Sequence, residues 1–206
     1  MKSEVFLQDC LIGMKSYPDK YFDLAVVDPP YGINRGETFG GKNWKEYEKK
    51  SWDKSVPNKK YFDELFRVSK HQIVFGANYM TEYLPASMGW IFWDKGQDLT
   101  MSDGELAYTS FDKALRRIVI NRCHIGELGG LLHPTQKPMK LYSWIYKNYL
   151  PEGGKVIDTH LGSGSNRIAA DKAGNIDFTG YEIDKDYYEA QEKRWKNYKA
   201  QLTMFA

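Results

Sequence analysis

The sequence predicts a single α/β domain built around a largely parallel sheet. Short apolar runs end at acidic residues and turn formers, as residues 24–27 do before Asp28. These runs alternate with segments of helical periodicity, the order typical of βαβ units. The 206 residues suffice for one such domain with a substantial core, but not for two comfortable ones.

The expected elements follow one another in a regular order. A strand at residues 5–7 and a helix at 11–17 precede a strand at 21–27, which completes a βαβ unit. Pro57 can begin a helix with an apolar face extending to Val68. Later expected segments are strands at 72–75, 89–93, 105–110, 117–120, 155–158 and 178–181, and helices at 76–84, 139–149, 166–173 and 186–202.

Composition excludes several classes of protein. Hydrophobic residues make up 42% of the chain and aromatics 15%, so a largely disordered chain is excluded. No apolar run approaches the roughly 20 residues of a membrane span, and no apolar segment follows the N-terminal charges, so we expect a cytoplasmic protein. Cys10 and Cys123 lie far apart and form no metal-ligand pattern, so we expect no metal site.

An unusual turn follows the strand at 21–27. Asp28-Pro29-Pro30-Tyr31-Gly32 places a carboxylate at a strand's carboxyl end, where open α/β sheets bind their ligands. The two prolines fix two φ angles and remove two backbone donors, so the turn is stiff. It can present a carboxylate, a carbonyl and an aromatic face to one small planar group. Asp-Pro alone is more often only a tight turn, but the whole string is much less common.

The last third of the chain has the pattern of a cofactor-binding unit. Gly162-Ser163-Gly164 joins a strand ending at Asp158 to a helix, and Glu182 ends the next strand 20 residues after Gly162. That interval suits an acid that binds ribose hydroxyls. Glycine turns also serve simply as loops, but the two acids favour an adenosine-containing cofactor. Arg167 replaces the third glycine of the dinucleotide pattern, which points away from NAD.

Taken together, four strings resemble those of a known enzyme family. They are Asp28-Pro29-Pro30-Tyr31, His133-Pro134-Thr135-Gln136-Lys137-Pro138, Asp158 with Gly162-Ser163-Gly164, and Gly180-Tyr181-Glu182, with Glu105 as a weaker fifth element. Their order is similar to that of the permuted amino-group DNA methyltransferases, which use S-adenosylmethionine and carry the catalytic motif before the cofactor motif. The resemblance covers nearly the whole chain and implies a circularly permuted class I methyltransferase: a Rossmann-like, seven-stranded mixed sheet flanked by helices.

The resemblance also implies roles for individual residues. The catalytic residues would be Asp28, Pro29, Pro30 and Tyr31. The cofactor site would be formed by Asp9, Cys10, Asp28, His133, Thr135, Lys137, Asp158, His160, Gly162, Ser163, Gly164, Ser165 and Glu182.

Two of these assignments carry alternatives. Permutation lets the strand at 5–7 complete the cofactor half, which makes Asp9 a cofactor candidate, although Asp9 suits a helix N-cap equally well. Thr159 and His160 stand where the family usually has a proline and an aromatic, so His160 is expected to fill the aromatic's place.

The implied reaction is methyl transfer to an exocyclic amino group of a flipped-out base. The lone pair of such an amine is delocalised into the ring, and by family analogy the Asp28 carboxylate and Pro29 carbonyl would accept its two hydrogens. Aspartate at the head of the motif favours adenine N6, because the cytosine N4 relatives more often carry serine there.

Two regions are expected to meet DNA. A mobile loop at 33–56 is rich in lysine and tryptophan, and a short target-recognition insertion at 96–132 contains an acid-free basic run from Lys113 to Arg122. A short insertion suggests a short recognition sequence, a homodimer or an accessory specificity subunit. The nucleic-acid candidates are Lys42, Trp44, Lys45, Trp52, Arg116 and Arg117.

Three other classes of function remain open to comparison. A catalytically silent nucleic-acid-binding subunit is disfavoured, because it would not need the intact catalytic string. A nucleotide-dependent oxidoreductase is disfavoured, because its dinucleotide-binding turn would require the third glycine. Cytosine N4, RNA and protein methyltransferases are harder to separate, since the turn suits any planar amide or amino group.

Overall fold

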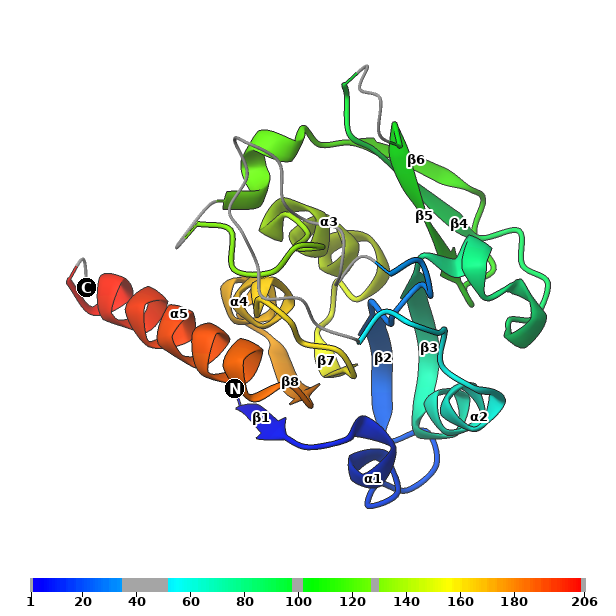
Figure 1. Cartoon of the computed structure of the whole chain (residues 1–206), viewed down its shortest axis with the longest axis horizontal. Coiled ribbons are helices and arrows are strands. Elements are labelled where there is room, and N and C mark those ends of the chain that lie inside the picture. Colours follow the sequence, from blue (N-terminus) through cyan, green and yellow to red (C-terminus); the bar gives the residue numbers. More distant parts are fainter. Residues whose placement is uncertain (1, 35–51, 98–101, 127–129, 205–206) are drawn as a thin grey trace.

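The computed structural model describes residues 2–34, 52–97, 102–126 and 130–204. In this part of the chain, eight strands form one sheet in the order β1-β8-β7-β2-β3-β5-β4-β6 (Figure 1). The strands are β1 (Ser3–Leu7), β2 (Phe22–Val27), β3 (Ser69–Phe75), β4 (Trp90–Asp94), β5 (Gly104–Thr109), β6 (Arg116–Val119), β7 (Gly154–Asp158) and β8 (Ile176–Glu182). The α-helices are α1 (Cys10–Met14), α2 (Lys59–Val68), α3 (Met139–Tyr149), α4 (Ser165–Ala173) and α5 (Lys185–Met204).

The sheet is mixed, as expected. Strands β1, β8, β7, β2 and β3 run parallel, whereas β5 is antiparallel to both of its neighbours, β3 and β4. All eight segments that the sequence predicts as strands form strands, but the implied count of seven is one too few. The additional strand is β6, a mostly exposed edge strand that pairs parallel with β4.

The permuted order is visible in the pairing of β1. This N-terminal strand lies parallel to β8, with Val5 opposite Gly180 and Leu7 opposite Glu182. Figure 1 shows β1 beside β8, close to where α5 begins. The expectation that residues 5–7 complete the cofactor half from the N-terminus is therefore confirmed for the backbone.

Helices cover both faces of the sheet, so the central strands carry short continuous apolar runs such as residues 24–27 of β2. In β2, Leu24 and Val26 belong to the core beneath α3 and α4, whereas Ala25 and Val27 face α1 and α2. Burial on both faces explains the continuous apolar run that precedes Asp28. None of the helices in the described ranges has the length and apolar character needed to cross a membrane.

One expected helix is replaced by shorter turns. The segment predicted as a helix at 76–84 contains two 3₁₀ turns, η1 (Ala77–Tyr79) and η2 (Thr81–Tyr83), and a third, η3 (Arg122–Gly126), follows β6. Met80, between the two turns, has φ −132° and ψ 21°, which lies outside the α-helical region. The two turns therefore do not join into one helix.

Candidate active site

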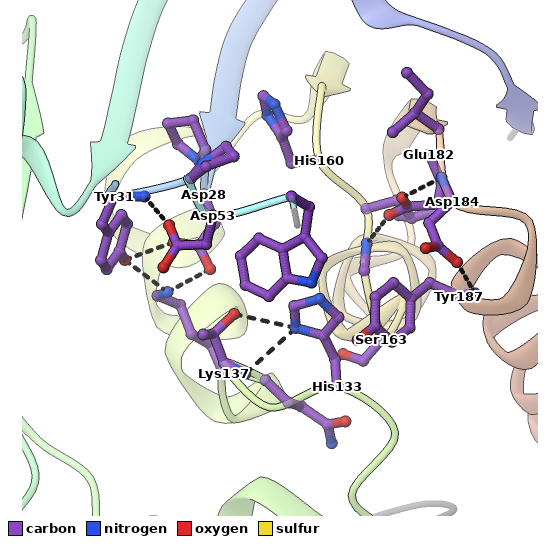
Figure 2. Close-up of a pocket in the computed structure, with 18 of the residues that line it drawn as sticks. Asp28, Tyr31, Asp53, His133, Lys137, His160, Ser163, Glu182, Asp184 and Tyr187 are labelled. Carbon is purple, nitrogen blue, oxygen red and sulfur yellow. Dashed lines mark hydrogen bonds and ion pairs between the residues drawn. The ribbon is translucent and has the colours of Figure 1, made fainter. Parts of the chain in front are cut away.

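The carboxyl ends of β2, β7 and β8 meet at one cavity of about 240 Å³. Figure 2 shows Asp28, Tyr31 and Lys137 on one side of it, and Glu182, Asp184 and Tyr187 on the opposite side. The catalytic and cofactor strings, far apart in sequence, thus share one cavity. Among the described residues it is lined by Asp28, Pro29, Pro30, Tyr31, Trp52, Asp53, His133, Thr135, Gln136, Lys137, Tyr142, His160, Leu161, Gly162, Ser163, Glu182, Ile183, Asp184 and Tyr187.

The turn after β2 is held by its own aromatic ring. The hydroxyl of Tyr31 donates a hydrogen bond of 2.6 Å to Asp28 Oδ1. The Tyr31 ring stacks on Tyr79 of η1, with centroids 5.4 Å apart and planes 15° apart. A Cβ atom on Gly76 would lie 2.1 Å from Tyr31 Cε1, so the ring packs directly against this glycine. Tyr79 and Gly76 therefore fix Tyr31, and no sequence pattern pointed to either.

Asp53 is a further site residue that the sequence did not reveal. Its buried carboxylate accepts hydrogen bonds from the backbone N–H groups of Tyr31, at 2.7 Å, and Gly32, at 2.9 Å. Because the two prolines have no N–H, these are the first backbone donors after Asp28. Figure 2 shows Asp53 beside Asp28 and Tyr31. Asp53 thus ties the segment that follows residue 51 to the catalytic turn.

Lys137, predicted as a cofactor residue, lies against the proposed catalytic carboxylate. Its Nζ is 2.5 Å from Asp28 Oδ2 and 3.2 Å from Glu105 Oε2. Burial raises the pKa of Asp28, Lys137 opposes this effect and the carboxylate of Glu105 adds to it; the net shift is upward. The ionisation of Asp28 therefore depends on its ion pair with Lys137 more than on solvent.

The glycine turn and Glu182 form a second fixed unit. The Glu182 carboxylate accepts the N–H of Gly162 at 2.8 Å and that of Asp184 at 2.9 Å, one on each oxygen. Gly162 has φ +52°, which favours glycine, and burial raises the pKa of Glu182. Each carboxylate oxygen keeps a second lone pair, the acceptors that ribose hydroxyls need. The residues at this end of the cavity therefore fit a nucleoside-type cofactor.

Aromatic rings line the space between these two units. The His133 ring lies 5.0 Å from that of Trp52 and 4.3 Å from that of Tyr187, centroid to centroid. His133 Nδ1 is 3.0 Å from the Thr135 hydroxyl, which holds the ring's orientation. Trp52, predicted to contact nucleic acid, thus lines the cavity itself, and its buried indole N–H has no hydrogen-bond partner among the described residues.

A buried layer supports the glycine turn from below. Asp158 accepts hydrogen bonds from Asn166 Nδ2 at 2.9 Å and from the His160 N–H at 3.0 Å, and burial raises its pKa to about 7. The Thr159 hydroxyl links Tyr61 to His160 Nδ1, and burial lowers the pKa of His160 to about 4, so that its ring is neutral at pH 7. The His160 ring meets that of Tyr61 edge-on at 5.5 Å, a packing role that an aromatic could also fill.

Several predicted cofactor residues are not among those lining the cavity: Asp9, Cys10, Asp158, Gly164 and Ser165. Asp9 is the N-cap of α1, where its carboxylate accepts the Leu11 N–H at 2.7 Å. Burial raises the pKa of the neighbouring Cys10 thiol to about 12. Arg167, at the position of the missing third glycine, points to α5 and pairs with Glu192 at 2.6 Å. The Arg167 side chain thus packs against α5 and does not line the cavity.

The predicted nucleic-acid residues are scattered. Lys42, Trp44 and Lys45 lie outside the described residues. Arg116 and Arg117 are on the exposed edge strand β6, where Arg117 pairs with Asp94 at 2.6 Å. No group of three or more His, Cys, Asp or Glu side chains in the described ranges is placed to hold a metal ion.

Solved structures share this fold. The complex of M1.HpyAVI with S-adenosylmethionine matches with a TM-score of 0.64 at 18% identity, covering 95% of this chain and 99% of that one. The cytosine-N4-specific PvuII DNA methyltransferase matches with a TM-score of 0.60 at 14% identity, covering 95% and 86%. The sheet, its order and the cavity at its carboxyl edge therefore define a class I methyltransferase fold.

Sequence comparison points to one family within that class. The profile of the N6/N4 DNA methylase family matches residues 93–193. The type II methyltransferase M.HpaI of Haemophilus parainfluenzae is 23% identical over 241 aligned positions, covering 94% of this chain and 74% of that protein. The chain is similar in sequence and fold to the amino-group DNA methyltransferases of the N6/N4 family, and its cofactor is S-adenosylmethionine.

Proposed function

We propose that this protein transfers a methyl group from S-adenosylmethionine to the exocyclic amino group of a flipped-out base in DNA, with adenine N6 as the acceptor. The observation that carries this proposal is the shared cavity, in which Asp28 at the end of β2 faces the glycine turn and Glu182 at the ends of β7 and β8. A carboxylate for an amino group and a carboxylate for ribose hydroxyls occupy its two ends.

The chain's own residues perform a positioning task in this mechanism. S-adenosylmethionine supplies a methyl group on a positively charged sulfur. Glu182 and the backbone of Gly162 would hold its nucleoside part, and Asp28 would accept an N–H of the target amine and so localise the nitrogen lone pair. The bound cofactor would supply the methyl carbon for the new nitrogen–carbon bond at the expense of its carbon–sulfur bond, and Asp28 would take up the surplus amine proton and pass it to water.

The choice of adenine rests on the residue at the head of the turn. Asp28 offers two acceptor oxygens, one to the amine and one to the buried ion pair with Lys137, whereas the serine typical of cytosine N4 relatives would not carry that charge. Because the cytosine-N4-specific PvuII enzyme has the same fold, cytosine N4 is the alternative acceptor.

We propose that DNA approaches over segments 33–56 and 96–132; of their described residues, Trp52 and Asp53 line the cavity and β6 is the edge strand of the sheet. Within 96–132, β5 and β6 are part of the sheet, so sequence readout falls to the connections between strands. These connections offer only a small surface for sequence readout. Such a surface suits a short target sequence, or a target read by a homodimer or with an accessory specificity subunit.

One experiment tests the proposal directly. Unmethylated DNA and RNA are incubated separately with the protein and S-adenosylmethionine carrying an isotopically labelled methyl group, and the digested nucleosides are analysed by mass spectrometry. Label in N6-methyldeoxyadenosine is the expected result. Label in N4-methyldeoxycytidine would replace the acceptor, label only in RNA would replace the polymer, and no label in any nucleoside would contradict the proposal.

A further inference from the structure

Charges alternate in a short, partly buried row behind the proposed catalytic turn. The ammonium of Lys137, whose side chain is 1% exposed, lies 2.5 Å from Asp28 and 3.2 Å from Glu105. Glu105 contacts a second ammonium, that of Lys95, at 3.1 Å. The row thus reads Asp28, Lys137, Glu105, Lys95, with two carboxylates and two ammonium groups.

The elements that supply this row come from separate parts of the chain. Lys137 lies two residues before α3, Glu105 is in β5, and Asp28 follows β2. The Lys137 ammonium also lies 4.8 Å from the Phe75 ring centroid and 3.1 Å from the Tyr31 hydroxyl. An ammonium enclosed in this way has little freedom to move to another partner.

Electrostatics show what the row does to Asp28. Burial favours the neutral acid, and Lys137 is the cation that contacts Asp28 within the described residues. Burial alone would lower the pKa of Lys137, but Asp28 and Glu105 together raise it, so Lys137 stays charged. For Glu105, burial raises the pKa, but Lys137 and Lys95 outweigh burial and lower it. The other titratable groups facing Asp28 are Tyr31, Asp53, Tyr61, Tyr142 and Asp158.

We propose that Lys137 is a positioning residue for methyl transfer, which keeps Asp28 ionised and fixes its carboxylate toward the target amine, and that Glu105 moderates this effect by sharing the same ammonium. This inference rests on the proposed function, because it needs Asp28 to act as an acceptor. An ionised carboxylate accepts the amine N–H, whereas a protonated one loses acceptor strength. Sequence resemblance had suggested a different role for Lys137, contact with the cofactor.

The test compares pH profiles of single-turnover methyl transfer to DNA in the wild type, Lys137→Met, Lys137→Arg and Glu105→Gln. Lys147→Met, which alters an exposed lysine of α3 outside the cavity, is the matched control. Affinity for S-adenosylmethionine is measured by calorimetry without DNA, so that binding is read independently of activity.

We expect Lys137→Met to move the acid-side inflection about one pH unit or more upward, which lowers the rate below that inflection about tenfold. Lys137→Arg keeps the positive charge, so its inflection should lie close to that of the wild type. Glu105→Gln should move the inflection downward, because a like charge near Asp28 is lost. Lys147→Met should behave as wild type. Cofactor affinity should stay within about threefold for all of them.

Two outcomes overturn the inference. An unmoved inflection in Lys137→Met together with a tenfold or greater loss of cofactor affinity would make Lys137 a cofactor ligand. If Lys137→Met does not fold, Glu105→Gln decides, and an unmoved or upward inflection in that variant contradicts the proposal. Absence of methyl transfer by the wild-type protein would instead contradict the proposed function, so the two failures are distinguishable.

Discussion

Replacing Asp53 by alanine tests how the catalytic turn is held. The variant removes the acceptor of two backbone hydrogen bonds, from Tyr31 at 2.7 Å and Gly32 at 2.9 Å. A hydrogen bond to a charged group contributes about 1.5–3 kcal/mol, and because both donors are only partly buried we use the lower figure. The two bonds then contribute about 3 kcal/mol. If the whole of this loss is added to the activation free energy, because the turn is no longer held in place, kcat falls about 100-fold.

The assay measures kcat at saturating DNA and cofactor, together with the affinity for S-adenosylmethionine by calorimetry. Both hydrogen bonds go to one oxygen, so Asp53→Asn retains an acceptor and should lose about tenfold or less. Asp112→Ala, at an exposed acid, is the control and should match the wild type. A kcat for Asp53→Ala within about twofold of wild type would refute the reasoning.

Two further predictions follow from buried contacts. Gly76→Ala combines strain at φ +63° with a Cβ atom 2.1 Å from Tyr31 Cε1, so kcat should fall about tenfold or more. The control Gly174→Ala, with φ +82° and no neighbour within 4 Å, should lose only about 1 kcal/mol of stability. Equal kcat values in the two variants would contradict this prediction. Burial raises the pKa of Asp158 to about 7 from 3.8, so its ionisation costs stability as pH rises through this window. Urea titrations should therefore show that the unfolding free energy of Asp158→Asn, relative to that of the wild type, rises by about 2–3 kcal/mol between pH 5 and pH 8. A difference that does not change with pH would count against that pKa.

Local patterns explain why so much of the sheet could be predicted. The run before Asp28 is apolar because β2 is buried on both faces, and the glycine turn before α4 is visible because Gly162 needs a positive φ. The helix at 139–149 was predicted with the same bounds that α3 has. Each of these features is encoded within about ten residues of sequence, where periodicity and turn chemistry operate.

The missed residues depend on contacts between distant segments. Asp53 reaches Tyr31 across 22 residues, and no local pattern marks an acid that accepts backbone N–H groups so far away. Lys137 was recognised as part of a motif, but its partner is decided by the position of β5 beside β3, which brings Glu105 to the same place. Gly76 and Tyr79 become site residues only because the chain turns back at η1 over Tyr31.

The measurement that tests the central claim most directly separates cofactor binding from methyl transfer in Asp28→Ala. Single-turnover transfer of a labelled methyl group to DNA and calorimetric affinity for S-adenosylmethionine are measured on the same preparation. We predict a loss of transfer of about 1,000-fold or more, because the amine loses its acceptor, with cofactor affinity within about threefold of wild type. Methyl transfer by Asp28→Ala at the wild-type rate would contradict the assignment of the turn after β2 as the site of the reaction.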